Sequence, residues 1–122
     1  MTGTITIREL HSMSELTACV QLQYDIWGIT PGNNTSSYLM NAAIHNGGAV
    51  HGAFSDDALI GFCFGFAAKR PQGWLLWSHM AGVLPDHQGR GIGRKLKFAQ
   101  RNWAAQQGYT AIGWTFDPLQ AG

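Results

Sequence analysis

A strand that runs through alternating glycines into a helix constrains the fold of this chain more than any other stretch. An apolar segment ends at Val83, the run Leu-Pro-Asp-His-Gln-Gly-Arg-Gly-Ile-Gly follows (residues 84–93), and helical periodicity comes next. Gly89, Gly91 and Gly93 lack a Cβ, so the backbone can adopt left-handed angles and approach a ligand closely. The first turn of a helix leaves N–H groups unpaired, and its dipole adds positive potential. The junction therefore predicts a phosphate-binding loop.

Two well-known phosphate loops fail on their spacing. A Walker A loop needs Gly-Lys-Ser/Thr, whereas Gly93 is followed by Arg94, Lys95 and a leucine. A dinucleotide fingerprint needs a glycine at the position of Arg94 and an acidic residue about twenty positions further on. The first acidic residue after Asp86 is Asp117. The sequence therefore disfavours a nucleotide-binding domain of either kind.

The spacing that fits is Gln88-x-x-Gly91-x-Gly93, preceded by Val83-x-Pro85. This run resembles motif A of the GNAT family of N-acetyltransferases, whose loop holds the pyrophosphate of acetyl-coenzyme A. The alternative is a glycine-rich turn that serves only the geometry between strand and helix. The resemblance implies acetyl-CoA as cosubstrate, with these contacts: Val83, Leu84, Gln88, Gly89, Arg90, Gly91, Ile92, Gly93 and Arg94.

Size and charge are those of a single small domain. The 122 residues are 45% hydrophobic, which is enough for a real core. The net charge is +1, so the total suggests neither a nucleic acid nor an acidic polymer as partner. Five of the eight Lys and Arg residues lie in the loop and its helix: Arg90, Arg94, Lys95, Lys97 and Arg101. Such a cluster is usually a solvated helix face, but beside a phosphate loop it suits the phosphates of coenzyme A.

Cysteine, histidine and hydropathy patterns exclude several other classes. Cys19 and Cys63 lie far apart without a Cys-x-x-Cys motif, so we expect reduced core thiols and neither a disulfide scaffold nor a zinc site. The histidines show no ligand spacing, so no metal site is predicted. No run approaches the roughly twenty apolar residues of a membrane span, and the N-terminus has no apolar signal region. We expect a cytoplasmic protein without a membrane partner.

The periodicity of apolar residues predicts an α+β sandwich with a mixed, mostly antiparallel sheet flanked by helices. Ser12, three positions before a Glu, predicts the start of the first helix. The strand around residues 59–66 is apolar on both faces, as in a sheet covered on both sides. The strand–helix–strand unit at the end predicts a parallel pair. The predicted elements are strand 4–10, helix 13–27, helix 36–45, strands 49–54, 58–69 and 74–83, helix 93–107 and strand 110–116.

The resemblance also implies more chain than the sequence holds. In the GNAT family the fifth strand is followed by a helix and two strands, which carry an Asn near the coenzyme and a Tyr that protonates the leaving thiolate. Here Asp117-Pro118 stops the strand, and the sequence ends four residues later. We therefore expect residues 1–122 to form one domain, truncated after the fifth strand, with an open sheet edge. Alternatively another chain fills the gap, for instance in a homodimer.

Acetyl transfer to an amine requires a positioned thioester, donors for the developing oxyanion, and a base. By resemblance, the base is a Glu, a His or an ordered water on the strand before the loop. That strand holds no carboxylate but contains Ser78 and His79, and histidine titrates near neutral pH. We expect His79 on the same face as Ala81 and Val83, and a bulge or splay at Gly82, just before the loop. The alternative is a His79 that only forms a hydrogen bond within the fold.

Two functions follow from these residues. The first is an acetyl-CoA-dependent N-acetyltransferase that transfers an acetyl group to a primary amine of a small-molecule or peptide acceptor. The second is a catalytically incomplete acyl-CoA-binding or assembly module. The sequence does not identify the acceptor, although Trp27 or Tyr38 can line its pocket.

Overall fold

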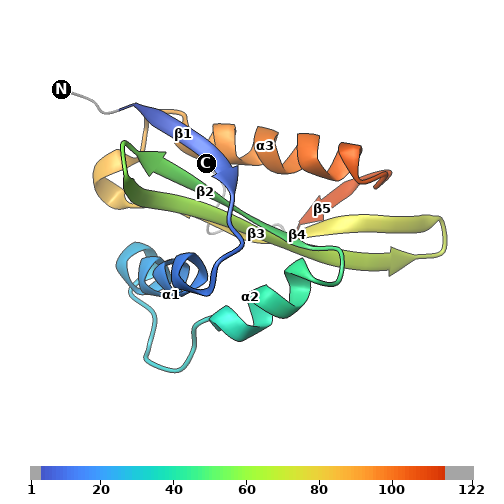
Figure 1. Ribbon diagram of the computed structural model, residues 1–122, viewed down its shortest axis with the longest axis horizontal. Helices are drawn as coiled ribbons and strands as arrows, with labels where there is room; N and C mark the ends of the chain where they lie inside the picture. The colour runs from blue at the N-terminus through green and yellow to red at the C-terminus, as the bar shows by residue number, and fades with distance from the viewer. Residues whose placement is uncertain (1–3, 115–122) are drawn as a thin grey trace.

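The computed structural model describes residues 4–114, which form one sheet with helices on both faces (Figure 1). Its elements match the predicted order and, within two residues, most of the predicted ends. They are β1 (Ile5–Glu9), α1 (Met13–Trp27), α2 (Ser37–Ile44), β2 (Ala49–Ser55), β3 (Ala58–Arg70), β4 (Gly73–Val83), the short 3-10 turn η1 (Pro85–His87), α3 (Ile92–Gln106) and β5 (Ile112–Trp114). The predicted α+β class is confirmed. The end of the last predicted strand and its Asp117-Pro118 stop lie outside the described residues.

The five strands follow the order β1-β2-β3-β4-β5. The first four pair antiparallel; short turns join β2 to β3 and β3 to β4, whereas α1 and α2 lie between β1 and β2 in the chain. β5 pairs parallel to β4, with Leu76 opposite Ile112 and Ser78 opposite Trp114. A parallel pair needs a crossover, and α3 supplies it, as the sequence predicts.

The sheet separates two cores. α1 and α2 lie on one face, where buried Leu16, Met40 and Phe64 pack together. α3 alone lies on the other face, where Ile92 and Leu96 pack on Cys63 of β3. Figure 1 shows this arrangement with α3 above the sheet and α1 and α2 below it. The end of β4 therefore lies between α3 on one face and the end of α1 on the other.

Helix α1 begins and ends where its capping residues predict. The Ser12 hydroxyl accepts a hydrogen bond from the Glu15 N–H at 3.2 Å. Gly28 closes the helix with a φ of 59°, which is the left-handed conformation that glycine tolerates best. The spacing of this helix predicts an inward stripe of Leu16, Cys19, Val20, Gln23, Ile26 and Trp27. Leu16, Cys19 and Gln23 are buried as predicted, Leu22 is buried as well, and Trp27 is 37% exposed.

Helix α3 differs from its predicted inward stripe. The periodicity of apolar residues predicts Ile92, Leu96, Ala99 and Trp103 on the inner face and Gln100 on the outer face. Gln100 is instead 2% exposed, and no partner for its Nε2 exists among the described residues. The buried positions are Ile92, Leu96, Gln100 and Ala104, spaced by four throughout. A stripe with this spacing drifts around the helix, since four residues exceed one turn. This drift of the buried stripe arises because α3 packs across several strands of a twisted sheet.

No helix of residues 4–114 combines the length and apolar character that crossing a membrane requires.

Candidate functional site

The loop between β4 and α3 takes its shape from two glycines. Pro85 opens the turn η1 directly after the last residues of β4. Gly89 and Gly91 have φ angles of 79° and 77°, so both occupy the left-handed region. Gly91 is also the N-cap of α3, and no side chain caps this helix. The sequence prediction of a left-handed glycine loop is confirmed at these two positions.

A row of backbone N–H groups at this junction is available for a ligand. Lys95 N–H is the first in α3 to bond within the chain, to Gly91 O at 3.1 Å. Within residues 4–114, six consecutive backbone N–H groups donate to no acceptor: those of Gly89, Arg90, Gly91, Ile92, Gly93 and Arg94. The helix dipole adds positive potential at the same place. Such an arrangement binds phosphate or another anion.

Gly93 is a glycine that the fold does not require. Its φ lies outside the left-handed region, and a Cβ placed on it would meet only Val83 Cγ2, at 4.0 Å. It lies in the first turn of α3, where alanine has the better helix propensity. Its own N–H is one of the unpaired groups, so a side chain at this position would lie next to them. The missing Cβ therefore leaves room for a ligand rather than for another part of the protein.

The side chain of Gln88 is used inside the protein. Its Nε2 donates to the backbone oxygen of Val83 at 2.9 Å. Its backbone N–H also donates within the protein, to Pro85 O at 3.3 Å. Gln88 therefore fixes the glycine loop to the end of β4, and neither its side-chain amide nor its N–H supports the predicted contact with the coenzyme. The η1 turn adds a second link, because His87 N–H donates to Leu84 O at 2.9 Å.

Val83 presents its backbone to the open side of β4. Leu84 N–H donates to Ile60 O on β3 at 2.8 Å. Neighbouring residues of a strand direct their N–H and C=O groups to opposite edges. The N–H and C=O of Val83 therefore face away from β3, and its C=O is the group that Gln88 contacts. This N–H is placed to bond an extended ligand that lies along β4.

Two arginines flank the loop. Arg90 Nη1 donates to His87 Nδ1 at 2.9 Å, and the guanidinium of Arg94 lies 5.5 Å from the centre of the Phe98 ring. Both arginines are exposed. Their exposed side chains add positive charge beside the fixed backbone N–H groups. Cationic side chains together with fixed N–H donors suit the binding of a pyrophosphate.

His79 does not lie on the predicted face of β4. The register shifts between Met80, which pairs with Phe64, and Ser78, which pairs with Gly65, so His79 is the extra residue of a β-bulge. Its ring lies 6.0 Å from that of Phe64 in the α1–α2 core. Ala81 and Val83 instead pack under α3. The predicted shared face is wrong because a bulge changes the alternation of side chains.

The bulge is also not at Gly82, where it was predicted. Gly82 pairs regularly with Phe62. A Cβ on Gly82 would lie 2.7 Å from Trp27 Cζ2, so this glycine lets the end of α1 approach β4 closely. His79 remains exposed on the same face. The structure thus places His79 and Gly82 on the same face of β4, with Trp27 packed over Gly82, and it directs Ser78, opposite Gly65, toward the other face.

Other buried polar groups lie away from this loop. His51 is 3% exposed, packs edge-on to Trp103, and has no partner for Nδ1 among the described residues. Burial lowers the pKa of His51 to about 4, so its imidazole is neutral. Burial likewise raises the pKa of the Cys19 and Cys63 thiols to about 12. Within residues 4–114, no group of three His, Cys, Asp or Glu side chains is arranged to hold a metal.

The chain has a mixed sheet whose fourth strand leads through a glycine loop into a crossover helix, and it shares this α+β fold with a solved acetyltransferase structure. The sequence profile of the acetyltransferase (GNAT) family matches residues 13–121, and the chain belongs to that family. The family predicted from the glycine run is confirmed. A search of curated proteins finds no match.

Solved structures share this fold at low sequence identity. One is the aminoglycoside acetyltransferase meta-AAC0020 from an uncultured soil metagenomic sample, at 16% identity and a TM-score of 0.83, covering 95% of this chain and 80% of that one. A second is the ribosomal-protein-alanine N-acetyltransferase of Brucella melitensis biovar Abortus 2308, at 16% identity and a TM-score of 0.75, covering 96% and 84%. A third is the aminoglycoside N-acetyltransferase AAC(6')-Iy in complex with CoA, at 18% identity and a TM-score of 0.74, covering 98% and 81%.

Proposed function

We propose that this chain is an acetyl-CoA-dependent N-acetyltransferase that transfers an acetyl group to a primary amine. The observation that carries the proposal is the row of unpaired N–H groups at the start of α3. This row includes the N–H of Gly93, where the fold itself has room for a side chain. Family membership supports the chemistry, and one structural neighbour is a complex with CoA.

The residues of the loop divide the binding between them. The N–H groups of Gly89 to Arg94 hold the pyrophosphate, and Arg90 and Arg94 neutralise its remaining charge. Val83 N–H, on the open side of β4, bonds the pantetheine arm and brings the thioester beside the strand. Gln88 keeps Val83 and the loop in register.

His79 is the proposed base. Acetyl-CoA supplies the thioester; a C–N bond to the acceptor amine forms, the C–S bond breaks, and coenzyme A leaves as the thiol, its sulfur taking the proton that the attacking nitrogen releases. The ammonium form of the amine must first lose a proton, which His79 accepts from the exposed α1–α2 side of β4. Ser78 directs its side chain to the other face, so its proposed contribution is limited to the backbone of the bulge.

The acceptor enters on the α1–α2 side, because α3 covers the opposite face of β4. Trp27, which is 37% exposed and packs over Gly82, forms one wall there. The neighbouring structures are named for aminoglycosides and for a ribosomal protein's alanine, so the acceptor tests should include small amines and peptides with a free N-terminus.

Calorimetric titration with acetyl-CoA, CoA and ATP tests the loop first. We expect acetyl-CoA and CoA to bind and ATP not to bind. A folded chain that binds neither coenzyme form would contradict the proposal.

Turnover then separates enzyme from binding module. We expect His79→Ala to lose acetyl transfer and keep coenzyme affinity, whereas His45→Ala, which changes an exposed histidine at the end of α2, keeps both. Coenzyme binding without transfer to any amine of the panel would instead identify an acyl-CoA-binding module.

A further inference from the structure

A histidine of the β4–α3 loop holds the side chain of Arg90. Arg90 Nη1 lies 2.9 Å from His87 Nδ1, three residues earlier in the chain. A guanidinium carries only hydrogen-bond donors, so Nδ1 accepts this bond and the proton of the imidazole lies on Nε2. His87 therefore acts in this contact as a neutral acceptor.

The backbone on both sides of the contact has a defined path. His87 N–H donates to Leu84 O at 2.9 Å within the turn η1. Gly89 and Gly91 have left-handed φ angles of 79° and 77° and direct the chain on each side of Arg90. The His87 side chain is half-buried, whereas Arg90 is exposed. The hydrogen bond thus ties a long exposed side chain to a residue whose backbone is held by the turn.

This tie restricts where the charge of Arg90 lies. An arginine side chain has more rotamer freedom than most others, so an exposed guanidinium ordinarily samples many positions around its Cα. Here the guanidinium is bound within the loop whose consecutive N–H groups, from Gly89 to Arg94, are unpaired within residues 4–114. The positive charge is therefore ordered in the same loop as the N–H donors before a ligand arrives.

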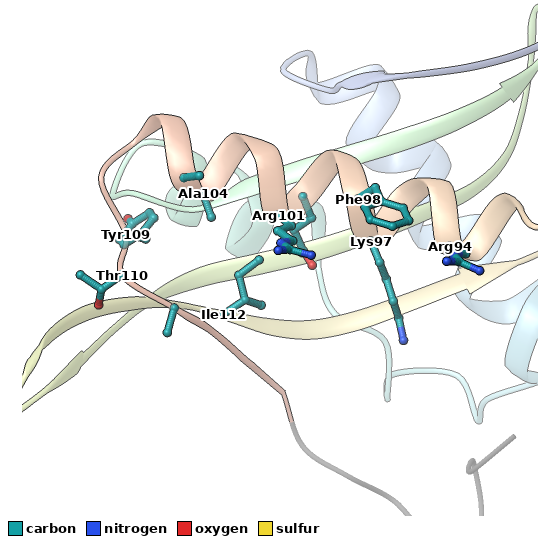
Figure 2. Close-up of a pocket in the computed structure, with 11 residues that line it drawn as sticks. Arg94, Lys97, Phe98, Arg101, Ala104, Tyr109, Thr110 and Ile112 are labelled. Carbon is teal, nitrogen blue, oxygen red and sulfur yellow. The ribbon is translucent and has the colours of Figure 1, made fainter.

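Arg94 carries the same charge in the first turn of α3 but is held differently. Its guanidinium lies 5.5 Å from the centre of the Phe98 ring, one turn further along the helix (Figure 2). This contact uses the ring face and involves neither His87 nor the turn η1. Arg94 is therefore a matched comparison for Arg90.

We propose that His87 is a positioning residue for the coenzyme: it holds the guanidinium of Arg90 against the pyrophosphate that the N–H groups of the loop bind. This inference rests on the proposed function, because acetyl-CoA must occupy the glycine loop. His87 acts only through Arg90, and its removal should matter only while that arginine is present.

A double-mutant cycle in calorimetric titration with acetyl-CoA tests the proposal. We expect His87→Ala to weaken binding about fivefold and Arg90→Ala to weaken it about tenfold. In the Arg90→Ala background, His87→Ala should change the affinity by less than about twofold, because the residue through which it acts is gone. In an Arg94→Ala background, His87→Ala should keep its full effect of about fivefold.

Two substitutions of similar size separate positioning from a structural role in the turn. The side-chain carbonyl of asparagine can accept from Arg90 in place of Nδ1, so His87→Asn should bind acetyl-CoA within about twofold of the unaltered chain. His87→Leu has no acceptor and should lose about as much affinity as His87→Ala. Circular dichroism confirms that each variant is folded.

A second ligand pair identifies the phosphate that Arg90 meets. 3′-Dephospho-CoA keeps the pyrophosphate of CoA and lacks only the phosphate on the ribose. We expect the cycle of His87 and Arg90 to give the same coupling, about fivefold, with both ligands. Coupling that appears with CoA and vanishes with 3′-dephospho-CoA would place Arg90 on the ribose phosphate and overturn the proposal.

The remaining outcomes distinguish this inference from the proposed function. If the unaltered chain binds acetyl-CoA, unchanged or tighter binding by His87→Ala contradicts the positioning role alone. Equal losses in His87→Asn and His87→Leu, or a loss that persists in the Arg90→Ala background, contradict it as well. A folded, unaltered chain that binds no coenzyme form contradicts both proposals.

Discussion

The amide Nε2 of Gln88 donates to the backbone oxygen of Val83 at 2.9 Å, and this bond joins the glycine loop to the strand beside it. A buried or half-buried hydrogen bond of this kind contributes about 1 kcal/mol. We expect Gln88→Ala to weaken acetyl-CoA binding about fivefold in calorimetry, because the loop loses its fixed position. Gln88→Glu should weaken it more, since a carboxylate cannot donate to Val83 and repels phosphate. Gln72→Ala, at the exposed β3–β4 turn, is the control and should leave affinity unchanged.

Gly93→Ala should separate folding from coenzyme binding. The position is helical and has room for a Cβ, so alanine should raise the free energy of unfolding by about 0.5–1 kcal/mol. The same methyl group narrows the proposed cradle and should weaken acetyl-CoA binding about tenfold. Gly91→Ala gives the opposite stability effect, because its φ of 77° costs alanine about 1 kcal/mol. Unchanged affinity in a folded Gly93→Ala chain would place the ligand elsewhere.

Replacing either of two buried glutamines by methionine should change the free energy of unfolding, in opposite directions for the two positions. Gln100 leaves Nε2 without a partner among the described residues, so Gln100→Met should stabilise the fold by about 1 kcal/mol. The amide of Gln23 is fully used by the backbone of Thr35, donating to its oxygen at 2.9 Å and accepting from its N–H at 2.7 Å. Gln23→Met should therefore destabilise by about 2 kcal/mol. Urea unfolding measures both changes, and equal signs would refute the contrast.

The buried His51 should make the fold sensitive to acid. Burial lowers the pKa of its folded-state imidazole to about 4, from an ordinary 6.5. Above pH 6.5 both states are neutral and stability is complete. Between pH 6.5 and 4 only the unfolded state takes up the proton, so the free energy of unfolding falls, by up to about 3 kcal/mol. Chemical denaturation across this range should show the loss, and His51→Leu should remove it. His45→Ala should retain it.

The two cysteines should be inert while the chain is folded. Burial raises the pKa of both thiols to about 12, so the reactive thiolate is scarce at neutral pH. Ellman's reagent should modify neither Cys19 nor Cys63 in the native chain and both in urea. Rapid labelling of one thiol under native conditions would show that its core opens.

The sequence was sufficient for those parts of the fold that depend on local rules. α1 runs from Met13 to Trp27 as predicted, because Ser12 caps its start and Gly28 its end. The glycine loop was found for the same reason, since left-handed angles at Gly89 and Gly91 require that residue type. Element order and the parallel β5 followed from chain connectivity.

The features that were missed depend on contacts between distant segments. Gln100 is polar, so the periodicity of apolar residues does not predict that this residue of α3 faces the sheet. Its burial depends on how α3 crosses the sheet. The bulge at His79 has no proline or glycine to mark it and depends on the register between β3 and β4. For the site, the loop could be predicted but the face of the proposed base could not.

The bulge has a consequence for comparing this chain with its relatives. Upstream of residue 79, even-numbered side chains such as Leu76 lie toward α3, and downstream the odd-numbered Ala81 and Val83 do so. The extra residue thus reverses which positions of β4 face α3 and which face α1 and α2. An ungapped alignment through β4 with a relative that lacks this bulge will equate residues from opposite faces. A residue role transferred from such a relative to Trp77 or Ser78 must therefore be shifted by one position.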